Sequence, residues 1–289
     1  MLILVGLGLT PESISVGALR AVQACDTVFL DAYTSILVSY DDMKHLVEEV
    51  LQRTDVVQCD RRAVEQGEDD IIDAARHGKA AFLVAGDVFC ATTHTNLFTR
   101  ACDEGIEVAV YHNASIISAI SCTGLDIYRF GRVVTVPLFT ESWRPASFLL
   151  QAEDNYRLDL HTLTLLQMST RELDIPKLVT TNIEVYNDPY YLYPGTAARQ
   201  ILELLQEGEG SGVFGPKSLI VICCRVGTPT QRLFMMTLED CASTPDDTFG
   251  APMFSLVFIG QHVSEPEFDM LKHAEATEST LQLLRGIML

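Results

Sequence analysis

Asp87 is the residue of this chain whose type and position most clearly suit chemistry. It follows an apolar run, residues 80–85, and a single glycine. A short apolar run that ends at glycine predicts a buried parallel strand, and open α/β proteins bind ligands just beyond the carboxyl ends of such strands. A carboxylate placed there could accept hydrogen bonds from ligand hydroxyls or amines. The alternative is an aspartate that only satisfies the backbone of its own turn.

The other reactive residue types show no catalytic spacing. The histidines form no HxxxH or HExxH pair, so the sequence predicts no metal site, and there is neither a GxSxG elbow nor a P-loop lysine. His94 and His112 could enter one crevice, although a loop histidine more often bonds only to nearby backbone. The eight cysteines include no CxxC pair and lie mostly in apolar surroundings, which indicates buried thiols in a reducing, cytoplasmic setting. The sequence therefore identifies no catalytic residue.

Two further strand ends accompany the one at Asp87. The strand predicted over residues 2–5 ends in a Gly-x-Gly pair, and the strand predicted over residues 108–111 ends in the polar residues 112–116. The glycine pair is not a dinucleotide fingerprint, because Pro11 stands where the third glycine would be. Since the carboxyl ends of parallel strands meet at one edge of a sheet, we expect these three loops to line one crevice for a small, polar, non-phosphate ligand.

The elements that must position these residues alternate between strand and helix in the first half of the chain. The strands predicted there cover residues 2–5, 27–30, 56–57, 80–85, 108–111 and 133–137. In the second half they cover residues 162–168, 219–224, 232–238 and 255–260. Helices are expected over residues 41–51, 65–76, 96–103 and 196–207, and along the tail from residue 266. The pattern predicts an α/β protein of two α/β domains, residues 1–140 with a parallel sheet and residues 141–289 with a mixed sheet.

The composition excludes several kinds of partner. The 289 residues carry a formal net charge of −19, whereas binding to nucleic acid or to an anionic membrane needs clustered Lys and Arg. With 48% hydrophobic residues the chain can bury a sizeable core, but no apolar run reaches the roughly 20 residues that span a bilayer. The first strand is also too short, and its start not basic enough, for a signal peptide. We therefore expect a cytoplasmic protein that binds neither nucleic acid nor membrane directly.

Several motifs of this chain, taken together, resemble those of the diphthine synthases, an S-adenosylmethionine-dependent branch of the tetrapyrrole methylase superfamily. They are residues 6–9 (Gly-Leu-Gly-Leu), 31–35 (Asp-Ala-Tyr-Thr-Ser), 86–87 (Gly-Asp), 91–94 (Ala-Thr-Thr-His), 113–116 (Asn-Ala-Ser-Ile), 124–131 (Gly-Leu-Asp-Ile-Tyr-Arg-Phe-Gly) and 160–163 (Leu-His-Thr-Leu). They occur in the same order and cover nearly the whole chain. Each match is modest by itself, but together, especially the Tyr-Thr-Ser, Ala-Thr-Thr-His and Tyr-Arg-Phe-Gly stretches, they are specific to this branch.

The resemblance implies a ligand and a reaction that the residues alone do not give. It implies two α/β domains with S-adenosylmethionine folded into the cleft between them, S-adenosylhomocysteine as the product, no metal, and usually a homodimer. The methyl groups would pass to the amino group of an aminocarboxypropyl arm on a histidine of elongation factor 2, in diphthamide biosynthesis. The family's cofactor contacts would fall here on Leu9, Asp87, Cys90, Ser115, Ile116, Leu166, Cys224 and Phe254.

This chain departs from the family at a few of these positions. The family usually has proline and glycine around the aspartate, where this chain has Val88 and Cys90, and often histidine where Phe254 stands. A backbone contact at Cys90 therefore requires a negative φ there. The group that would accept the proton from the methylated amine is not identified by the sequence.

Two other functions stay open at this point. A methyltransferase that acts on a small molecule such as a tetrapyrrole would need basic residues in its cleft to meet the carboxylates of the substrate, and this acidic chain has few to offer. A non-catalytic protein that binds a nucleotide-like ligand and a partner would keep the cofactor site without transferring methyl groups.

Overall fold

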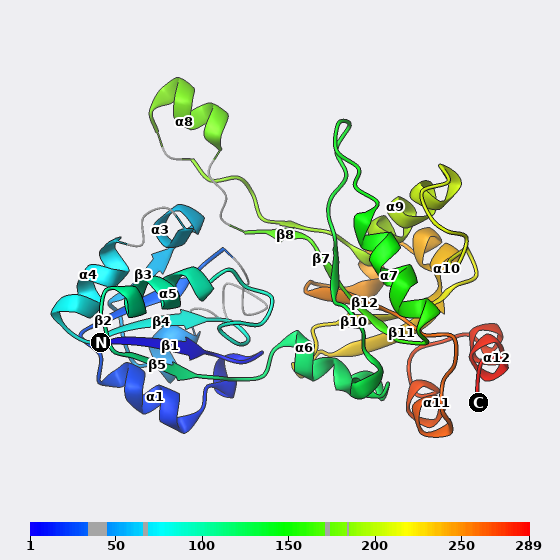
Figure 1. Cartoon of the computed structure of the whole chain (residues 1–289), viewed down its shortest axis with the longest axis horizontal. Coiled ribbons are helices and arrows are strands. Elements are labelled where there is room, and N and C mark those ends of the chain that lie inside the picture. Colours follow the sequence, from blue (N-terminus) through cyan, green and yellow to red (C-terminus); the bar gives the residue numbers. More distant parts are fainter. Residues whose placement is uncertain (34–44, 66–68, 171–173, 184) are drawn as a thin grey trace. The chain divides into compact units, whose positions relative to one another are not determined.

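The computed structural model describes residues 1–33, 45–65, 69–170, 174–183 and 185–289 (Figure 1). These residues divide into two compact units: unit 1 comprises Met1–Ile117 and Met168–Tyr190, and unit 2 comprises Ser118–Gln167 and Tyr191–Leu289. This division differs from the predicted single boundary between residues 140 and 141. The first unit ends earlier in the chain and then takes up a segment of the second half.

Unit 1 is built on a parallel sheet of five strands in the order β3-β2-β4-β1-β5. The strands are β1 (Leu2–Gly6), β2 (Thr27–Asp31), β3 (Val56–Cys59), β4 (Ala80–Val84) and β5 (Val108–Tyr111). Each corresponds to a strand predicted from the sequence. Because all five run the same way, the loops that follow β1, β4 and β5 leave from one edge of the sheet, and these three strands are neighbours in the order β4-β1-β5.

The helices of unit 1 agree less closely with the prediction. They are α1 (Val16–Gln23), α3 (Arg61–Glu65), α4 (Asp69–His77), α5 (Thr95–Asp103), α6 (Ile116–Ala119) and α8 (Ile175–Thr181). The helix expected over residues 65–76 is replaced by α3 and α4, with residues 66–68 between them outside the described part. The helix expected over residues 41–51 begins outside the described residues, and its described part contains a π-helical turn, Leu46–Val50.

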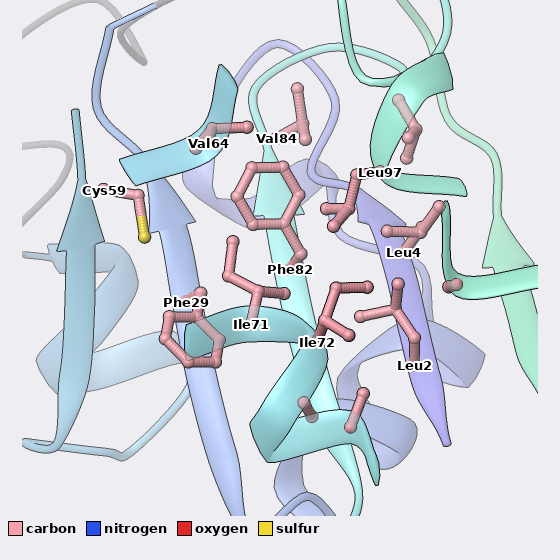
Figure 2. Packing of buried hydrophobic residues seen from close by; sticks show 14 of the residues in the cluster. Leu2, Leu4, Phe29, Cys59, Val64, Ile71, Ile72, Phe82, Val84 and Leu97 are labelled. Carbon is pink, nitrogen blue, oxygen red and sulfur yellow. The ribbon is translucent and has the colours of Figure 1, made fainter. Parts of the chain in front are cut away.

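Both faces of this sheet are buried, which explains the unbroken apolar runs of β1 and β4. Leu4 and Phe82 pack with Ile72 of α4 in one apolar cluster, which Figure 2 shows from close by. Val5 and Leu83, the next residues along the same strands, belong to a second cluster. Successive side chains of a strand point to opposite faces, so a strand covered on both sides needs apolar residues at every position.

The segment 168–190 returns from the second half of the chain to unit 1. It holds the short strand β8 (Met168–Ser169), which pairs with β9 (Tyr190–Tyr191). The Thr170 hydroxyl donates a hydrogen bond to the carbonyl oxygen of Ala32 (3.0 Å), and the Tyr186 hydroxyl donates to Asp60 Oδ2 (3.1 Å). These contacts attach the segment to the residues that follow β2 and β3.

Unit 2 contains a mixed sheet of five strands in the order β11-β10-β12-β7-β6. They are β6 (Val134–Val136), β7 (Thr162–Leu166), β10 (Leu219–Cys224), β11 (Arg232–Thr237) and β12 (Phe254–Phe258). All neighbours are antiparallel except β6 and β7, which are parallel. The strand predicted over residues 133–137 was expected in the first domain, residues 1–140, but it is β6 of unit 2 and makes its ladder with β7. Local sequence carries no signal for which of two sheets an apolar strand joins.

The helices of unit 2 are α7 (Ser147–Arg157), α9 (Pro194–Gln206), α10 (Leu238–Ser243), α11 (Glu265–Leu271) and α12 (Glu278–Gly286). Of these, α7 and α10 were not expected, and the single helix expected in the tail is α11 and α12. The break has a local cause, since Thr277 starts α12 by accepting a hydrogen bond from the backbone amide of Thr280 (3.2 Å). Across the described ranges, no helix is both long enough and apolar enough to cross a membrane.

A buried ion-pair network in unit 2 centres on Glu267, in the first turn of α11. Arg129 Nη1 lies 2.9 Å from Glu267 Oε2, and His161 Nε2 lies 3.0 Å from Glu267 Oε1. The backbone amide of Gly260 donates to His161 Nδ1 (2.9 Å), so the ring proton is on Nε2 and is donated to the carboxylate. Arg129 and His161 come from the Tyr-Arg-Phe-Gly and Leu-His-Thr-Leu stretches, which therefore hold unit 2 together.

The network fixes the charge of both titratable partners. Burial alone would raise the pKa of Glu267, but hydrogen bonds from the backbone amides of Ser264 and Asp126 and from His161 outweigh it and lower the pKa to about 2. Burial is also the main cause that lowers the pKa of His161. At neutral pH the network therefore consists of a carboxylate, a neutral imidazole and a guanidinium.

We expect Glu267→Gln to lower the free energy of unfolding near neutral pH by on the order of 3 kcal/mol, because the pKa falls from 4.5 to about 2 on folding. A depressed carboxyl pKa stabilises the fold fully above pH 4.5, and this contribution disappears as the pH falls towards 2. Urea unfolding of both proteins at several pH values measures the difference. Glu275→Gln is the control, since its half-exposed pair with Arg232 should be worth less than about 1 kcal/mol. Equal losses for the two variants would contradict the prediction.

Candidate functional site

The loops that follow β1 and β4 are joined by their backbones at the carboxyl edge of the sheet of unit 1. The amide of Gly8 donates to the carbonyl of Gly86 (3.0 Å), and the amide of Gly86 donates to the carbonyl of Gly8 (2.8 Å). This pairing is antiparallel, although the strands themselves are parallel. Two central strands therefore open into loops that remain in contact beyond the last residue of each strand.

Glycine is required at two places in the first of these loops. Gly8 has a φ of +82°, in the left-handed region, and a Cβ there would lie 2.5 Å from Cβ of Ser13. A Cβ on Gly6 would lie 2.7 Å from the carbonyl oxygen of Gly86. The glycine pair of the sequence thus exists because the two loops approach each other so closely.

Asn113 joins the third loop to the first. Its side-chain Nδ2 donates to the carbonyl oxygens of Gly6 (3.1 Å) and Ser13 (2.9 Å). The sequence placed this residue in a polar strand end but gave no signal for its partners, which lie about a hundred residues away in the chain. With these bonds the three loops predicted to converge are held together within unit 1.

Asp87 is buried among these loops and its carboxylate is well bonded. Oδ1 accepts a hydrogen bond from the amide of Phe89 (3.0 Å), and Oδ2 accepts from the amide of Asn113 (3.0 Å) and from Nδ1 of His112 (2.9 Å). Burial alone would raise the pKa of Asp87, but these three bonds outweigh it and the pKa lies below its ordinary value. A fixed negative charge at this edge suits a ligand that is cationic or rich in hydrogen-bond donors.

The other predicted contacts in unit 1 lie in the same three loops. Leu9 directly follows Gly8 and is partly buried, and Cys90 follows the Asp87 turn and is also partly buried. Ser115 is buried, and its hydroxyl accepts from the amide of Ile117 (3.2 Å), while Ile116 is the first residue of α6. Among the non-glycine residues of the Asp87 loop, the left-handed φ falls on Ala91 (+61°) and not on Cys90. The condition set for a backbone contact at Cys90 is therefore met.

The two loop histidines bond to different carboxylates. His112 is mostly exposed and bonds to Asp87, whereas His94 is buried and its Nε2 lies 3.0 Å from Oδ2 of Asp31. The expectation that each bonds only to backbone is wrong. Nδ1 of His94 is one of two buried side-chain polar atoms in the described part of the chain that have no hydrogen-bond partner. Asp31 and Tyr33 are described, while Thr34 and Ser35 of the same motif lie outside the described residues.

The three contacts predicted in unit 2 lie together at one edge of its own sheet. Cys224 at the end of β10 is in register with Phe254 at the start of β12, and Leu165 pairs with Ser255 in the adjoining ladder. Leu166 is the next residue of β7, so it falls at the same edge. All three side chains are buried, and the ring of Phe254 packs against Tyr193 with centroids 4.9 Å apart. This edge is apolar and suits the flat face of an aromatic ligand group.

The described residues at these two edges offer binding groups, a buried carboxylate in unit 1 and an apolar surface in unit 2. Burial raises the pKa of the Cys224 thiol to about 11, so the thiol stays protonated and is a poor nucleophile at neutral pH. No group of three or more His, Cys, Asp or Glu residues in the described part of the chain could hold a metal ion. The loops of unit 1, residues 6–13, 86–94 and 112–116, contain no Lys or Arg.

Comparisons with known proteins show which family this chain belongs to and which proteins it is similar to. The family model described as Tetrapyrrole (Corrin/Porphyrin) Methylases matches residues 1–242. The diphthine methyl ester synthase of Neurospora crassa is 39% identical over 273 residues, covering 94% of this chain and 93% of that protein. The enzyme of the same name from Aspergillus fumigatus is 41% identical over 268 residues, covering 92% and 91%.

Solved structures agree with the sequence relatives. A crystal structure of an Entamoeba histolytica protein has a TM-score of 0.81 and 35% identity, covering 96% of this chain and 99% of that one. A crystal structure of diphthine synthase has a TM-score of 0.77 and 27% identity, covering 98% and 99%. The predicted α/β fold of the tetrapyrrole methylase type is thereby confirmed.

We expect Gly8→Ala to cost more than twice as much stability as Gly105→Ala. Both glycines have a left-handed φ, which alone costs an alanine about 1 kcal/mol, but nothing lies within 4 Å of a Cβ on Gly105, whereas a Cβ on Gly8 overlaps Ser13. Urea unfolding of the two variants and the parent measures both costs. Similar values would show that the loop at Gly8 can move aside without loss, and that its closeness to Ser13 is not a constraint.

Proposed function

This chain belongs to the tetrapyrrole methylases as a methyltransferase of diphthamide biosynthesis, and we propose that it transfers methyl groups from S-adenosylmethionine to the modified histidine of elongation factor 2. The acceptor is the amino group of the aminocarboxypropyl arm on that histidine. The Neurospora crassa relative is named for a methyl ester, so we extend the proposal to a carboxylate oxygen of the same arm.

The observation that carries the proposal is the meeting of three strand-end loops around Asp87 in unit 1. Their buried carboxylate suits a ligand with a positive charge and several hydroxyl or amino donors. The sulfonium, amino and ribose groups of S-adenosylmethionine have this character. The absence of Lys and Arg from the three loops disfavours a phosphate ligand.

The residues that would hold the methyl donor come from both units. Those of unit 1 are Leu9, Asp87, Cys90, Ser115 and Ile116, and those of unit 2 are Leu166, Cys224 and Phe254. We propose hydrogen bonds from the first set and apolar contacts to the adenine from the second, because that is the chemistry of the two edges. None of the three departures from the family pattern, at Val88, Cys90 and Phe254, removes a backbone donor or acceptor, so the backbone contacts are compatible with binding.

The proposed reaction requires little acid–base catalysis by the protein. The sulfonium of the bound donor supplies an activated methyl group, so the chain must hold the acceptor in line with it and keep water away. This requirement is met without a thiol nucleophile, and the raised pKa of the Cys224 thiol is compatible with it. The acceptor amine must be unprotonated when it attacks.

Two further features belong to the same proposal. We propose a homodimer that works in the cytoplasm, on the grounds of the resemblance and of the eight free cysteines. A methyltransferase of a tetrapyrrole is the less favoured alternative, because the loops of unit 1 offer no cation to the several carboxylates of such a substrate.

Transfer of labelled methyl groups tests the proposed function. The chain is incubated with methyl-labelled S-adenosylmethionine and with elongation factor 2 that carries the aminocarboxypropyl-histidine, and we expect label in the factor. Factor without that modification is the control and should stay unlabelled. Binding of the methyl donor with no label in either factor would favour the non-catalytic alternative instead.

We expect Asp87→Ala to weaken binding of S-adenosylhomocysteine about ten- to a hundredfold while the protein stays folded. The substitution removes a charge-assisted acceptor from the donor site, typically worth about 1.5–3 kcal/mol. Isothermal titration calorimetry measures the affinity, and circular dichroism checks the fold. Asp55→Ala removes an exposed carboxylate of the same unit and should leave the affinity unchanged. An unchanged affinity in a folded Asp87 variant would leave Asp87 as a turn residue only.

A further inference from the structure

Arg225 is a buried cation at the end of β10, and none of the described carboxylates pairs with it. It is 8% exposed and has a left-handed φ of +50°, which is uncommon for a residue with a side chain. Its Nε donates to the carbonyl and hydroxyl oxygens of Thr230 (both 3.1 Å), and its Nη1 donates to the carbonyl oxygens of Phe249 (3.0 Å) and Ala251. Every one of these acceptors is neutral. Buried charges in proteins are normally paired, and the residues that the structure describes supply no negative partner to this one.

The guanidinium also has unused donors. A guanidinium carries five N–H groups, of which Nε and Nη1 supply three, and no partner of the two on Nη2 occurs among the described residues. Nη2 is not completely buried, because in the described part of the chain the only fully buried side-chain atoms without a partner are His94 Nδ1 and Asp246 Oδ1. One edge of Arg225 is therefore held rigidly by neutral acceptors, and the other edge can receive a ligand oxygen.

The position of Arg225 connects it with the apolar edge of unit 2. It directly follows Cys224, and its backbone amide donates to the carbonyl of Met253 (2.8 Å), the residue before Phe254. It therefore stands one residue beyond the register pair that is expected to contact the methyl donor. The loops of unit 1 contain no cation, so Arg225 is the basic group nearest in sequence to any residue of the candidate site.

We propose that Arg225 binds the carboxylate of an α-amino acid group through Nη2. This proposal rests on the proposed function, because both molecules of that reaction carry such a group: the methyl donor at its methionine end and the acceptor on its aminocarboxypropyl arm. Guanidinium and carboxylate form strong, directional pairs, and the neutral contacts on Nε and Nη1 keep the charge available for that pairing. Arg225 thereby adds a binding residue that selects ligands with a carboxylate.

The test compares two methyl donors on two proteins. Calorimetry measures the affinity of the wild-type chain and of Arg225→Gln for S-adenosylmethionine and for decarboxylated S-adenosylmethionine, which differs only by the missing carboxylate. If Arg225 binds the donor, the wild type prefers the carboxylated form about ten- to a hundredfold and the variant loses that preference. If Arg225 binds the acceptor, the variant binds each donor as tightly as the wild type does. Its KM for the modified elongation factor 2 then rises about tenfold or more.

The comparison separates carboxylate binding from a purely structural role. Arg225 also holds the loops at Thr230 and Phe249, and damage to these loops would weaken both donors alike and leave the KM for the factor unchanged; that result would overturn the proposal. Arg232→Gln is the matched control, since Arg232 is in register with Cys224 on β11 but is exposed and paired with Glu275. We expect it to change none of these quantities.

A second variant covers the case in which Arg225→Gln does not fold. Arg225→Lys keeps the charge but not the paired donors, and we expect it to reduce the preference for the carboxylated donor, or to raise the KM for the factor, by a smaller factor. No change in either quantity would overturn the proposal. If the wild type binds neither methyl donor, the proposed function fails as well, and this result is distinct from equal weakening of both donors.

Discussion

The two hydrogen bonds between Gly8 and Gly86 are the constraint on which the candidate site depends. They extend the contact between β1 and β4 past the ends of both strands, and they leave no room for a Cβ at Gly6. Asn113 can reach Gly6 and Ser13 only because this loop lies so close to the sheet edge. Asp87 follows Gly86 directly, so its carboxylate meets the amide of Asn113 through the same arrangement. The close approach of the loops and the buried charge of the site therefore have one structural cause.

The polar groups that the chain buries fall into two kinds. The carboxylates Asp87 and Glu267 are fully supplied with donors, and their pKa values are lowered as a result. Such groups organise loops and helix starts, and they contribute to stability at neutral pH. His94 and Arg225 instead keep a polar atom without a partner in the described chain. Unsatisfied donors and acceptors next to a sheet edge are where a ligand can still gain binding energy.

The fold of unit 1 could be predicted well because its signals are local. Apolar runs that end at glycine or at a polar residue mark all five strands, and their parallel order follows from the alternation with helices. The site residues of unit 1 could be placed in common loops for the same reason. Two features could not be predicted: that β6 joins the sheet of unit 2, and that the chain returns to unit 1 over residues 168–190. Both depend on pairings between distant segments. Arg225 could not be predicted either, because an arginine after an apolar strand has the same sequence whether it is exposed or buried.

The return of segment 168–190 to unit 1 has a consequence for the order in which the protein can fold during synthesis. Thr170 and Tyr186 bond to Ala32 and Asp60, so the residues after β2 and β3 lack these partners until about 190 residues have left the ribosome. By then β6 and β7 of the other unit have also been made. Neither unit corresponds to one continuous stretch of chain, so a cut in the gene that yields a single uninterrupted fragment cannot deliver one complete unit without part of the other. A truncation that removes part of one unit therefore also removes or interrupts part of the other.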